Sequence, residues 1–158
     1  MRYQDQVVKQ TQRALDDVLR AVEALPEDKR DWKPAETARS ALNQLQEVAM
    51  SPQFFVPILR EGKMPEFDDH AKEEADRLKK SFDTFEKCRE AAMEGTSELC
   101  QVISEFPDDR LEEEVTLPFA GGTAMTMADV LGLHAWNMTY HHGQVNYIQT
   151  MLGDMEMH

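Results

Sequence analysis

The 158-residue sequence is poor in the features that mark several protein classes. Its 17 Lys and Arg face 30 Asp and Glu, and the resulting net charge of −13 repels nucleic-acid phosphates and anionic lipid headgroups. No stretch approaches the roughly 20 apolar residues that a membrane-spanning helix needs. The N-terminal residues also lack the apolar core of a secretory signal peptide. We therefore expect a cytoplasmic protein that binds neither nucleic acid nor membranes.

Cysteine is scarce as well, with only Cys88 and Cys100 in the chain. The two lie within one predicted helix, where twelve residues correspond to a separation of about 18 Å. This distance is too long for a disulfide bond. Because the sequence has no C-x-x-C pair, neither a redox motif nor a cysteine zinc site is indicated. We expect both cysteines to be small buried side chains.

Glycine and proline are also limited, at seven residues each, and hydrophobic residues make up 41% of the chain. This composition excludes collagen-like and largely disordered chains. A chain of this length is typical of one compact domain, and we expect a single domain over residues 1–158.

Apolar residues recur at helical spacing through most of the chain, and this periodicity predicts helices over residues 3–25, 39–60, 69–106 and 127–152. A short extended excursion is predicted over Val115–Met125, around Gly121 and Gly122. These elements predict an all-α, up-and-down four-helix bundle. The residues expected in its core are Leu15, Val18, Val22, Leu45, Leu78, Phe82, Phe85, Leu99, Ile103, Val130, Val145 and Ile148.

Polar side chains interrupt the apolar face of the last predicted helix. His134, Asn137 and His141 share this face, which is apolar at both ends. Buried imidazole and amide groups cost free energy unless they have partners. The face therefore needs hydrogen bonds from another helix, a metal ion or a water-filled cleft, and the residues alone leave these alternatives open.

Two segments of the sequence resemble the DinB-like family of damage-inducible four-helix bundles. The string HAWNMTYHHGQVNYIQTMLG, from His134 to Gly153, is similar to the last helix of that family, above all in Tyr140-His141-x-Gly143-Gln144. The earlier string DWKPAETARSALNQLQEV is similar in its Trp32-x-Pro34 and in the Ser that opens the second helix. The resemblance covers most of the chain and implies the same fold.

In the family that the chain resembles, three histidines typically hold a divalent metal ion. One lies seven residues after the Ser of the second helix, here Ser40, and two lie on the last helix. Carried over by position, the metal ligands fall on Glu47, Asn137 and His141, so only one histidine of the set is present. His134, one turn before Asn137, is a substitute ligand. Because an amide oxygen binds transition metals less well than an imidazole, we expect nickel or zinc binding to be weak or absent.

The position of Glu47 on its helix leaves a second interpretation open. The apolar stripe of the second helix, formed by Leu42, Leu45, Val48 and Ala49, is centred away from Glu47. A glutamate at the rim of such a stripe is often a solvated surface acid.

The resemblance implies a metal-dependent hydrolase or a transferase that uses a low-molecular-weight thiol such as mycothiol or bacillithiol. The loss of two expected histidines supports an alternative, a non-catalytic bundle with a decayed metal site that binds a ligand or partner in stress response. Members of the family commonly pair, and Tyr140, Gly143 and Tyr147 share a face that points away from His141. We therefore expect a homodimer with a small-molecule or thiol substrate.

Overall fold

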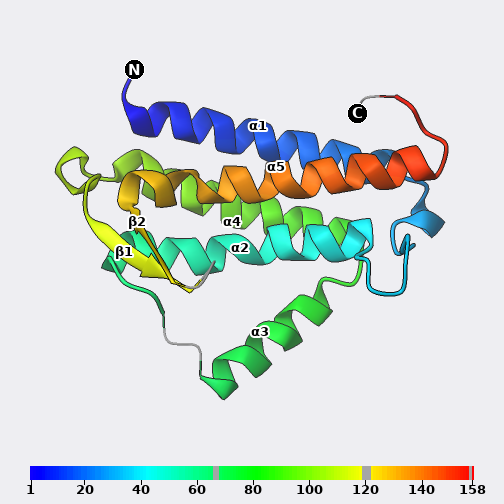
Figure 1. Cartoon of the computed structure of the whole chain (residues 1–158), viewed down its shortest axis with the longest axis horizontal. Coiled ribbons are helices and arrows are strands. Elements are labelled where there is room, and N and C mark those ends of the chain that lie inside the picture. Colours follow the sequence, from blue (N-terminus) through cyan, green and yellow to red (C-terminus); the bar gives the residue numbers. More distant parts are fainter. Residues whose placement is uncertain (66–67, 119–121, 157) are drawn as a thin grey trace.

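The computed structural model describes residues 1–65, 68–118, 122–156 and 158. Four long helices lie side by side in a bundle (Figure 1): α1 (Tyr3–Ala24), α2 (Ala41–Glu61), α4 (Phe85–Glu105) and α5 (Met127–Met151). A shorter helix, α3 (Asp69–Ser81), projects away from them. The predicted four-helix bundle is confirmed. None of the helices in the described residues combines the length and the apolar composition needed to cross a bilayer.

The bundle pairs α2 mainly with α4, and α1 mainly with α5, while α5 also packs against α2. Ser40 begins α2 by accepting a hydrogen bond from the main-chain N–H of Asn43. Thr126 begins α5 with a capping box that includes Asp129. These caps fix where the two helices that carry the polar residues start, and therefore which side chains face each other.

An antiparallel hairpin precedes α5. Its strands are β1 (Glu114–Leu117) and β2 (Thr123–Thr126), with Glu114 opposite Thr126 and Leu117 opposite Thr123. The predicted extended excursion is thus present, although Gly121 lies outside the described residues. Leu117 is buried, so the hairpin closes one end of the bundle core.

The prediction of one continuous helix over residues 69–106 is wrong. The chain leaves the helical conformation at Phe82 (φ −85°, ψ 59°), and Thr84 starts α4 by accepting a hydrogen bond from the N–H of Lys87. No residue of α3 is buried. Leu78 and Phe82 are only partly buried, and Phe82 packs against the edge of the core, so neither is a fully buried core residue as predicted.

The other predicted core residues are buried: Leu15, Val18, Val22, Leu45, Phe85, Leu99, Ile103, Val130, Val145 and Ile148. Cys88 and Cys100 are both buried, free thiols, as expected. Burial, together with nearby acidic residues, raises the pKa of Cys88 to about 12. A thiol with so high a pKa stays protonated and is a poor nucleophile.

Candidate functional site

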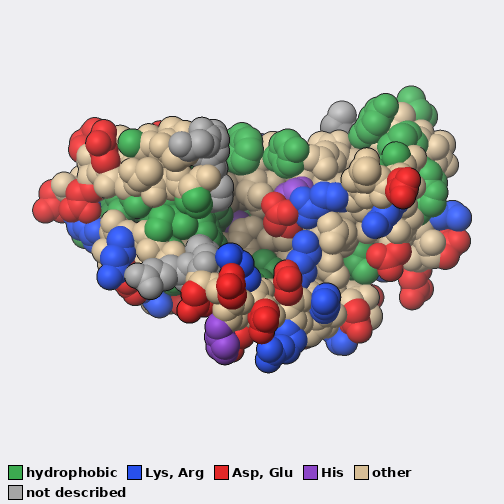
Figure 2. Space-filling view, turned by 60° about the horizontal axis from the view of Figure 1, so that its bottom comes forward, with side chains coloured by type: hydrophobic (Ala, Val, Ile, Leu, Met, Phe, Trp, Pro, Cys, Tyr) green, Lys and Arg blue, Asp and Glu red, His purple; other side chains and the backbone are tan. Residues whose placement is uncertain are grey.

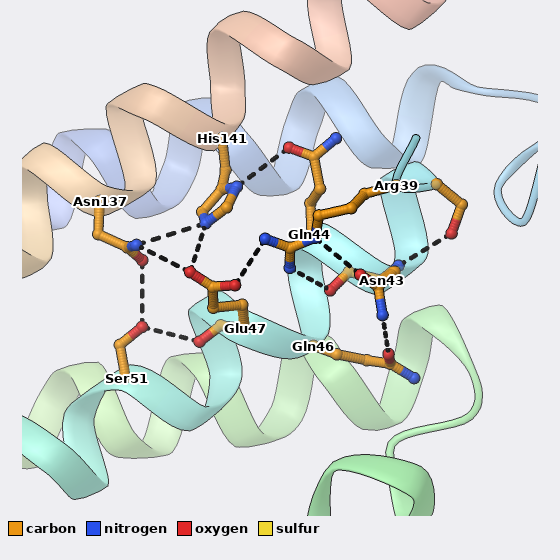
Figure 3. Close-up of polar contacts among 9 residues, drawn as sticks. Arg39, Asn43, Gln44, Gln46, Glu47, Ser51, Asn137 and His141 are labelled. Carbon is orange, nitrogen blue, oxygen red and sulfur yellow. Dashed lines mark hydrogen bonds and ion pairs between the residues drawn. The ribbon is translucent and has the colours of Figure 1, made fainter. Parts of the chain in front are cut away.

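The structure brings Glu47 of α2 together with Asn137 and His141 of α5 (Figure 3). Nε2 of His141 lies 3.1 Å from Oε1 of Glu47. Nδ2 of Asn137 lies 3.4 Å from the same oxygen and 3.3 Å from Nε2 of His141. The three polar ends therefore form a nearly equilateral triangle between two helices that are far apart in the sequence.

Glu47 lies at the rim of the bundle, as its helical position indicates, but its carboxylate faces inward. Its side chain is 42% exposed, whereas that of His141 is fully buried. The hydrogen bond from His141 is the main cause that lowers the pKa of Glu47 to about 2, and the charge of Arg39, whose guanidinium lies 2.6 Å from Oε2, lowers it further. Burial acts in the opposite direction. The carboxylate is therefore ionised at neutral pH.

Gln44 orients the His141 ring. Its Oε1 lies 3.0 Å from Nδ1 of His141 and can accept the hydrogen on that nitrogen. Nε2 faces the carboxylate of Glu47 and donates a hydrogen bond to it when both ring nitrogens carry a hydrogen. When only Nδ1 carries one, Nε2 and Oε1 are two acceptors 3.1 Å apart, and they need a positive charge or a hydrogen from another group between them. Metal-binding histidines commonly have this second hydrogen bond at the ring nitrogen that faces away from the metal.

Asn137 supplies such hydrogens in the structure. The Ser51 hydroxyl lies 3.1 Å from Oδ1 of Asn137 and 2.7 Å from the main-chain oxygen of Glu47, and its one hydrogen can be donated to either acceptor. The amide nitrogen of Asn137 is turned toward Glu47 and His141. A side-chain amide rotated by 180° presents its oxygen in place of its nitrogen with almost no change of shape. The Ser51 oxygen can also accept a hydrogen bond, so it is compatible with both orientations. Asn137 can therefore act as a hydrogen donor or as an oxygen ligand at the same point.

His134 does not join this triangle. Its Nε2 lies 2.9 Å from the hydroxyl of Thr96 on α4, and the ring packs 6.3 Å from that of Phe55. Burial lowers the pKa of His134 to about 4, so the ring is neutral at physiological pH. The hydrogen bond to Thr96 and the place of the ring in the core, apart from the triangle, disfavour the substitute-ligand role, and Nδ1 is buried with no hydrogen-bond partner among the described residues.

The residues present fit a divalent metal only in part. Within the described ranges, no group of three or more His, Cys, Asp or Glu side chains is placed to hold an ion. Glu47 and His141 supply two donors at a spacing compatible with a shared ion, because ligand bonds of about 2.0–2.2 Å place neighbouring donors roughly 3 Å apart. Asn137 completes a set of three only when its oxygen faces inward. This donor set fits a loosely held ion.

A mainly apolar pocket of about 640 Å³ lies beside the triangle. Glu47 and Asn137 form a polar part of its lining, and Trp136 of α5 and Phe55 of α2 contribute aromatic walls. Its other lining residues are Leu117, Thr123, Met125 and Leu133. Figure 2 shows a face of the molecule that is hollowed near its middle, where acidic, basic and histidine side chains gather. A small molecule in the pocket would lie next to an ionised carboxylate and a side-chain amide.

Sequence reasoning missed Gln44, Ser51 and Arg39. A signal for the first two is present, because positions 44, 47 and 51 follow helical spacing and form a polar stripe along α2. That stripe runs beside the apolar one and faces the polar centre of α5. Arg39 lies before the helix begins, and no periodic pattern identifies it.

The fold and site define a helical-bundle protein with a histidine–carboxylate cluster next to an apolar pocket. The chain belongs to the DinB superfamily, whose family model matches residues 10–145. No curated protein matches the chain in sequence.

Several solved structures share the fold. YfiT from Bacillus subtilis, described as "a probable metal-dependent hydrolase with an unusual four-helix bundle topology", is 15% identical, with a TM-score of 0.75 over 95% of this chain and 87% of its own. A mycothiol-dependent maleylpyruvate isomerase is 11% identical to this chain, with a TM-score of 0.71. The match covers 90% of this chain and 60% of the isomerase chain. The colibactin self-resistance protein ClbS, solved with double-stranded DNA, is 13% identical, with a TM-score of 0.67 over 93% of this chain and 95% of its own. At these identities the similarity shows the fold alone.

Proposed function

We propose that this chain binds a divalent metal ion, nickel or zinc, weakly through Glu47, His141 and the amide oxygen of Asn137. In this proposal it acts on a small molecule in the adjacent pocket, as a hydrolase or as a transferase that uses a low-molecular-weight thiol. The observation that carries the proposal is the 3.1 Å approach of His141 Nε2 to Glu47 Oε1, with Gln44 placed to bond the other ring nitrogen. The similarity of the fold to that of YfiT, described as a probable metal-dependent hydrolase, and to that of the mycothiol-dependent isomerase supports the reaction class.

Each residue of the site has a distinct part in this proposal. A bound metal would lower the pKa of a coordinated water or thiol and so supply a nucleophile near neutral pH. Gln44 keeps Nε2 of His141 turned toward Glu47. Arg39 fixes the second oxygen of Glu47, at 2.6 Å, and leaves Oε1 directed into the triangle. The apolar pocket walls bind the substrate body and exclude water from around it.

A second candidate function is a non-catalytic bundle with a decayed metal site that binds a ligand or partner in stress response. One specific observation favours it. Arg39 balances the charge of Glu47, and the Asn137 amide hydrogens lie between the Glu47 and His141 acceptors. The cluster is thus charge-balanced and hydrogen-bonded by protein groups alone.

The proposal also includes the partners expected from the sequence. We infer a homodimer in the cytoplasm, with a thiol or another small molecule as substrate. We infer no nucleic-acid binding, because the net charge of −13 opposes it. The DNA in the ClbS structure is a property of that protein.

Elemental analysis tests the metal proposal directly. Wild type and His141→Ala are purified in parallel without an affinity tag or chelator, and their metal content is measured. We expect nickel or zinc in wild type at less than one ion per chain and a clear decrease in His141→Ala. Equal trace amounts in both proteins would contradict the metal site and support the non-catalytic alternative.

A further inference from the structure

A second cavity of the molecule lies beside α5 and shares no lining residue with the apolar pocket next to Glu47. It is a groove of about 610 Å³ between one side of α5 and the segment before α2, and we call it the Arg39 groove. Its walls are mainly apolar or aromatic and include Pro34, Tyr147, Ile148 and Met151. The volume lies within the range of small-molecule binding sites.

The Arg39 groove and the apolar pocket differ in charge. Among the described residues, Arg39 is the only charged residue that lines the groove, and Glu47 is the only charged residue that lines the pocket. The two side chains form an ion pair, with an Nη atom of Arg39 2.6 Å from Oε2 of Glu47. The pair therefore connects two cavities, and the groove presents the positive side of it.

Arg39 has hydrogen-bond donors left for a ligand. A guanidinium group carries five N–H hydrogens. Nε and one Nη donate to the side-chain and main-chain oxygens of Asn43, at 2.8 and 3.2 Å, and the other Nη pairs with Glu47. Two hydrogens, one on each Nη, have no acceptor in the part of the chain that the structure describes, and the side chain is 34% exposed. Hydrogen bonds from such a group to a carboxylate are among the stronger ones in proteins.

Gln44 offers a further donor to the groove. Its Oε1 lies 3.0 Å from Nδ1 of His141, and its amide nitrogen points away from the ring (Figure 3). That nitrogen has no acceptor within the described residues, and Gln44 lines the groove. An unpaired donor at the wall of a mainly apolar groove favours a ligand that supplies an acceptor. A carboxylate group has only acceptors and fits both Gln44 and Arg39.

The rest of the groove determines what the carboxylate is attached to. Tyr140 and Tyr147 are 53% and 66% exposed and present aromatic surface, so an apolar or aromatic body fits beside them. A second copy of the chain that packed through the same helix would not supply the acceptor, because residues 130–153 contain no Asp or Glu. The unpaired donors therefore favour a separate small molecule as the occupant.

We propose that the Arg39 groove binds a small carboxylate with an apolar body, and that this ligand acts on the Glu47–His141 pair. Arg39 contacts Glu47 and Gln44 contacts His141, so the two donors of the groove hold both of these residues from behind. A carboxylate beside Arg39 offsets the positive charge next to Glu47 and increases the attraction of Glu47 for a metal ion. The carboxylate site needs no metal, and only its effect on metal affinity rests on the proposed function.

Nuclear magnetic resonance titration of the metal-free protein with 3-phenylpropionate tests the binding. Its uncharged amide, 3-phenylpropionamide, is the matched probe. We expect saturable shifts of the main-chain signals of Gly143 and Tyr147 with a dissociation constant of about 1 mM, which is typical of a ligand of this size. The amide should bind about tenfold more weakly. Equal affinity for the two probes, or shifts confined to Phe55 and Met125 of the apolar pocket, would overturn the proposal.

Substitutions at two glycines of α5 test the position of the site. A Cβ atom at Gly143 would meet no heavy atom within 4 Å, so Gly143→Leu should fold normally and place its side chain in the open groove. Gly132→Leu is the matched control, because its Cβ is equally unobstructed but lines a different groove. We expect binding to weaken at least about tenfold in Gly143→Leu and to be unchanged in Gly132→Leu.

Arg39→Lys tests the recognition of charge. It keeps a positive charge beside Glu47 but loses the planar set of donors, and binding should weaken about fivefold. Unchanged affinity in both Gly143→Leu and Arg39→Lys would place the carboxylate elsewhere. Absence of binding by wild type would also overturn the proposal, and sedimentation velocity of the same sample would then show whether a second copy fills the groove.

The His141 ring-nitrogen signals in the metal-free titration report on the coupling. The carboxylate should shift them and the amide should not, and unchanged signals would overturn the coupling. In a zinc titration, saturating 3-phenylpropionate should tighten zinc binding to wild type about fivefold. Gly143→Leu is the control for direct association of zinc with the probe, and its zinc affinity should not respond. A wild type that binds the carboxylate but no zinc would refute the metal site and support the carboxylate site.

Discussion

Replacing the Glu47 carboxylate by an amide should destabilise the protein in a strongly pH-dependent way. The fall in the pKa of Glu47 from its ordinary value of 4.5 to about 2 corresponds to about 3 kcal/mol of stabilisation of the charged form. The side chain is 42% exposed, and solvent screening reduces this to about 1–2 kcal/mol. We therefore expect Glu47→Gln to lose about 1–2 kcal/mol in the free energy of unfolding at pH 7.

The direction with pH follows from the lowered pKa. The unfolded state takes up the proton near pH 4.5, whereas the folded state does so only near pH 2. The stabilisation by Glu47 is therefore complete above the unfolded-state pKa of 4.5 and is lost as the pH falls through the folded-state pKa of about 2. Wild type and Glu47→Gln should differ in stability at pH 7 and converge as the pH approaches about 2.

Urea denaturation followed by circular dichroism at a series of pH values measures this difference. Glu98→Gln is the matched control, because Glu98 also pairs with an arginine, Arg60 at 2.9 Å, but both side chains are more than half exposed. The control should lose less than about 0.5 kcal/mol at any pH. An equal loss in both variants, or a Glu47→Gln effect that does not change with pH, would refute the reasoning.

Two further predictions concern the core. Phe82→Ala should lower the free energy of unfolding by about 1–2 kcal/mol, because Phe82 is only partly buried where α3 ends. Leu45→Ala, at a fully buried position, should lower it by about 3–4 kcal/mol. Urea denaturation measures both losses. Because burial lowers the pKa of His134 from 6.5 to about 4, the unfolded state binds a proton before the folded state does, and stability should fall as pH decreases between these values. The His134→Leu, Thr96→Val double variant, which removes both partners of the buried hydrogen bond, should lose that dependence.

The bundle could be predicted from sequence because long apolar faces repeat at helical spacing and clear caps begin α2 and α5. The break between α3 and α4 could not, because Leu78, Phe82 and Phe85 keep the spacing of one continuous helix. The helix ends at Phe82 through its backbone conformation and through the cap at Thr84. Apolar periodicity does not record either feature, and Thr84 alone is a weak signal.

The candidate site was predictable for the residues that interrupt an apolar face, and less so for those that orient them. The position of His141 in a polar gap, with the family resemblance, identified the cluster with Asn137 and Glu47. The roles of Gln44 and Ser51 depend on which of their side-chain atoms face the His141 ring and the Asn137 amide. That information arises only when α2 and α5 are packed against each other.

Calorimetric titration of zinc and nickel into wild type, His141→Ala and Asn137→His tests the central claim, that Glu47, Asn137 and His141 form a weakened metal site. We expect weak binding by wild type and none by His141→Ala. Asn137→His should bind at least about tenfold more tightly, because an imidazole replaces an amide oxygen as ligand. Identical binding curves for wild type and His141→Ala would contradict the claim and leave His141 as a hydrogen-bonding residue of the core.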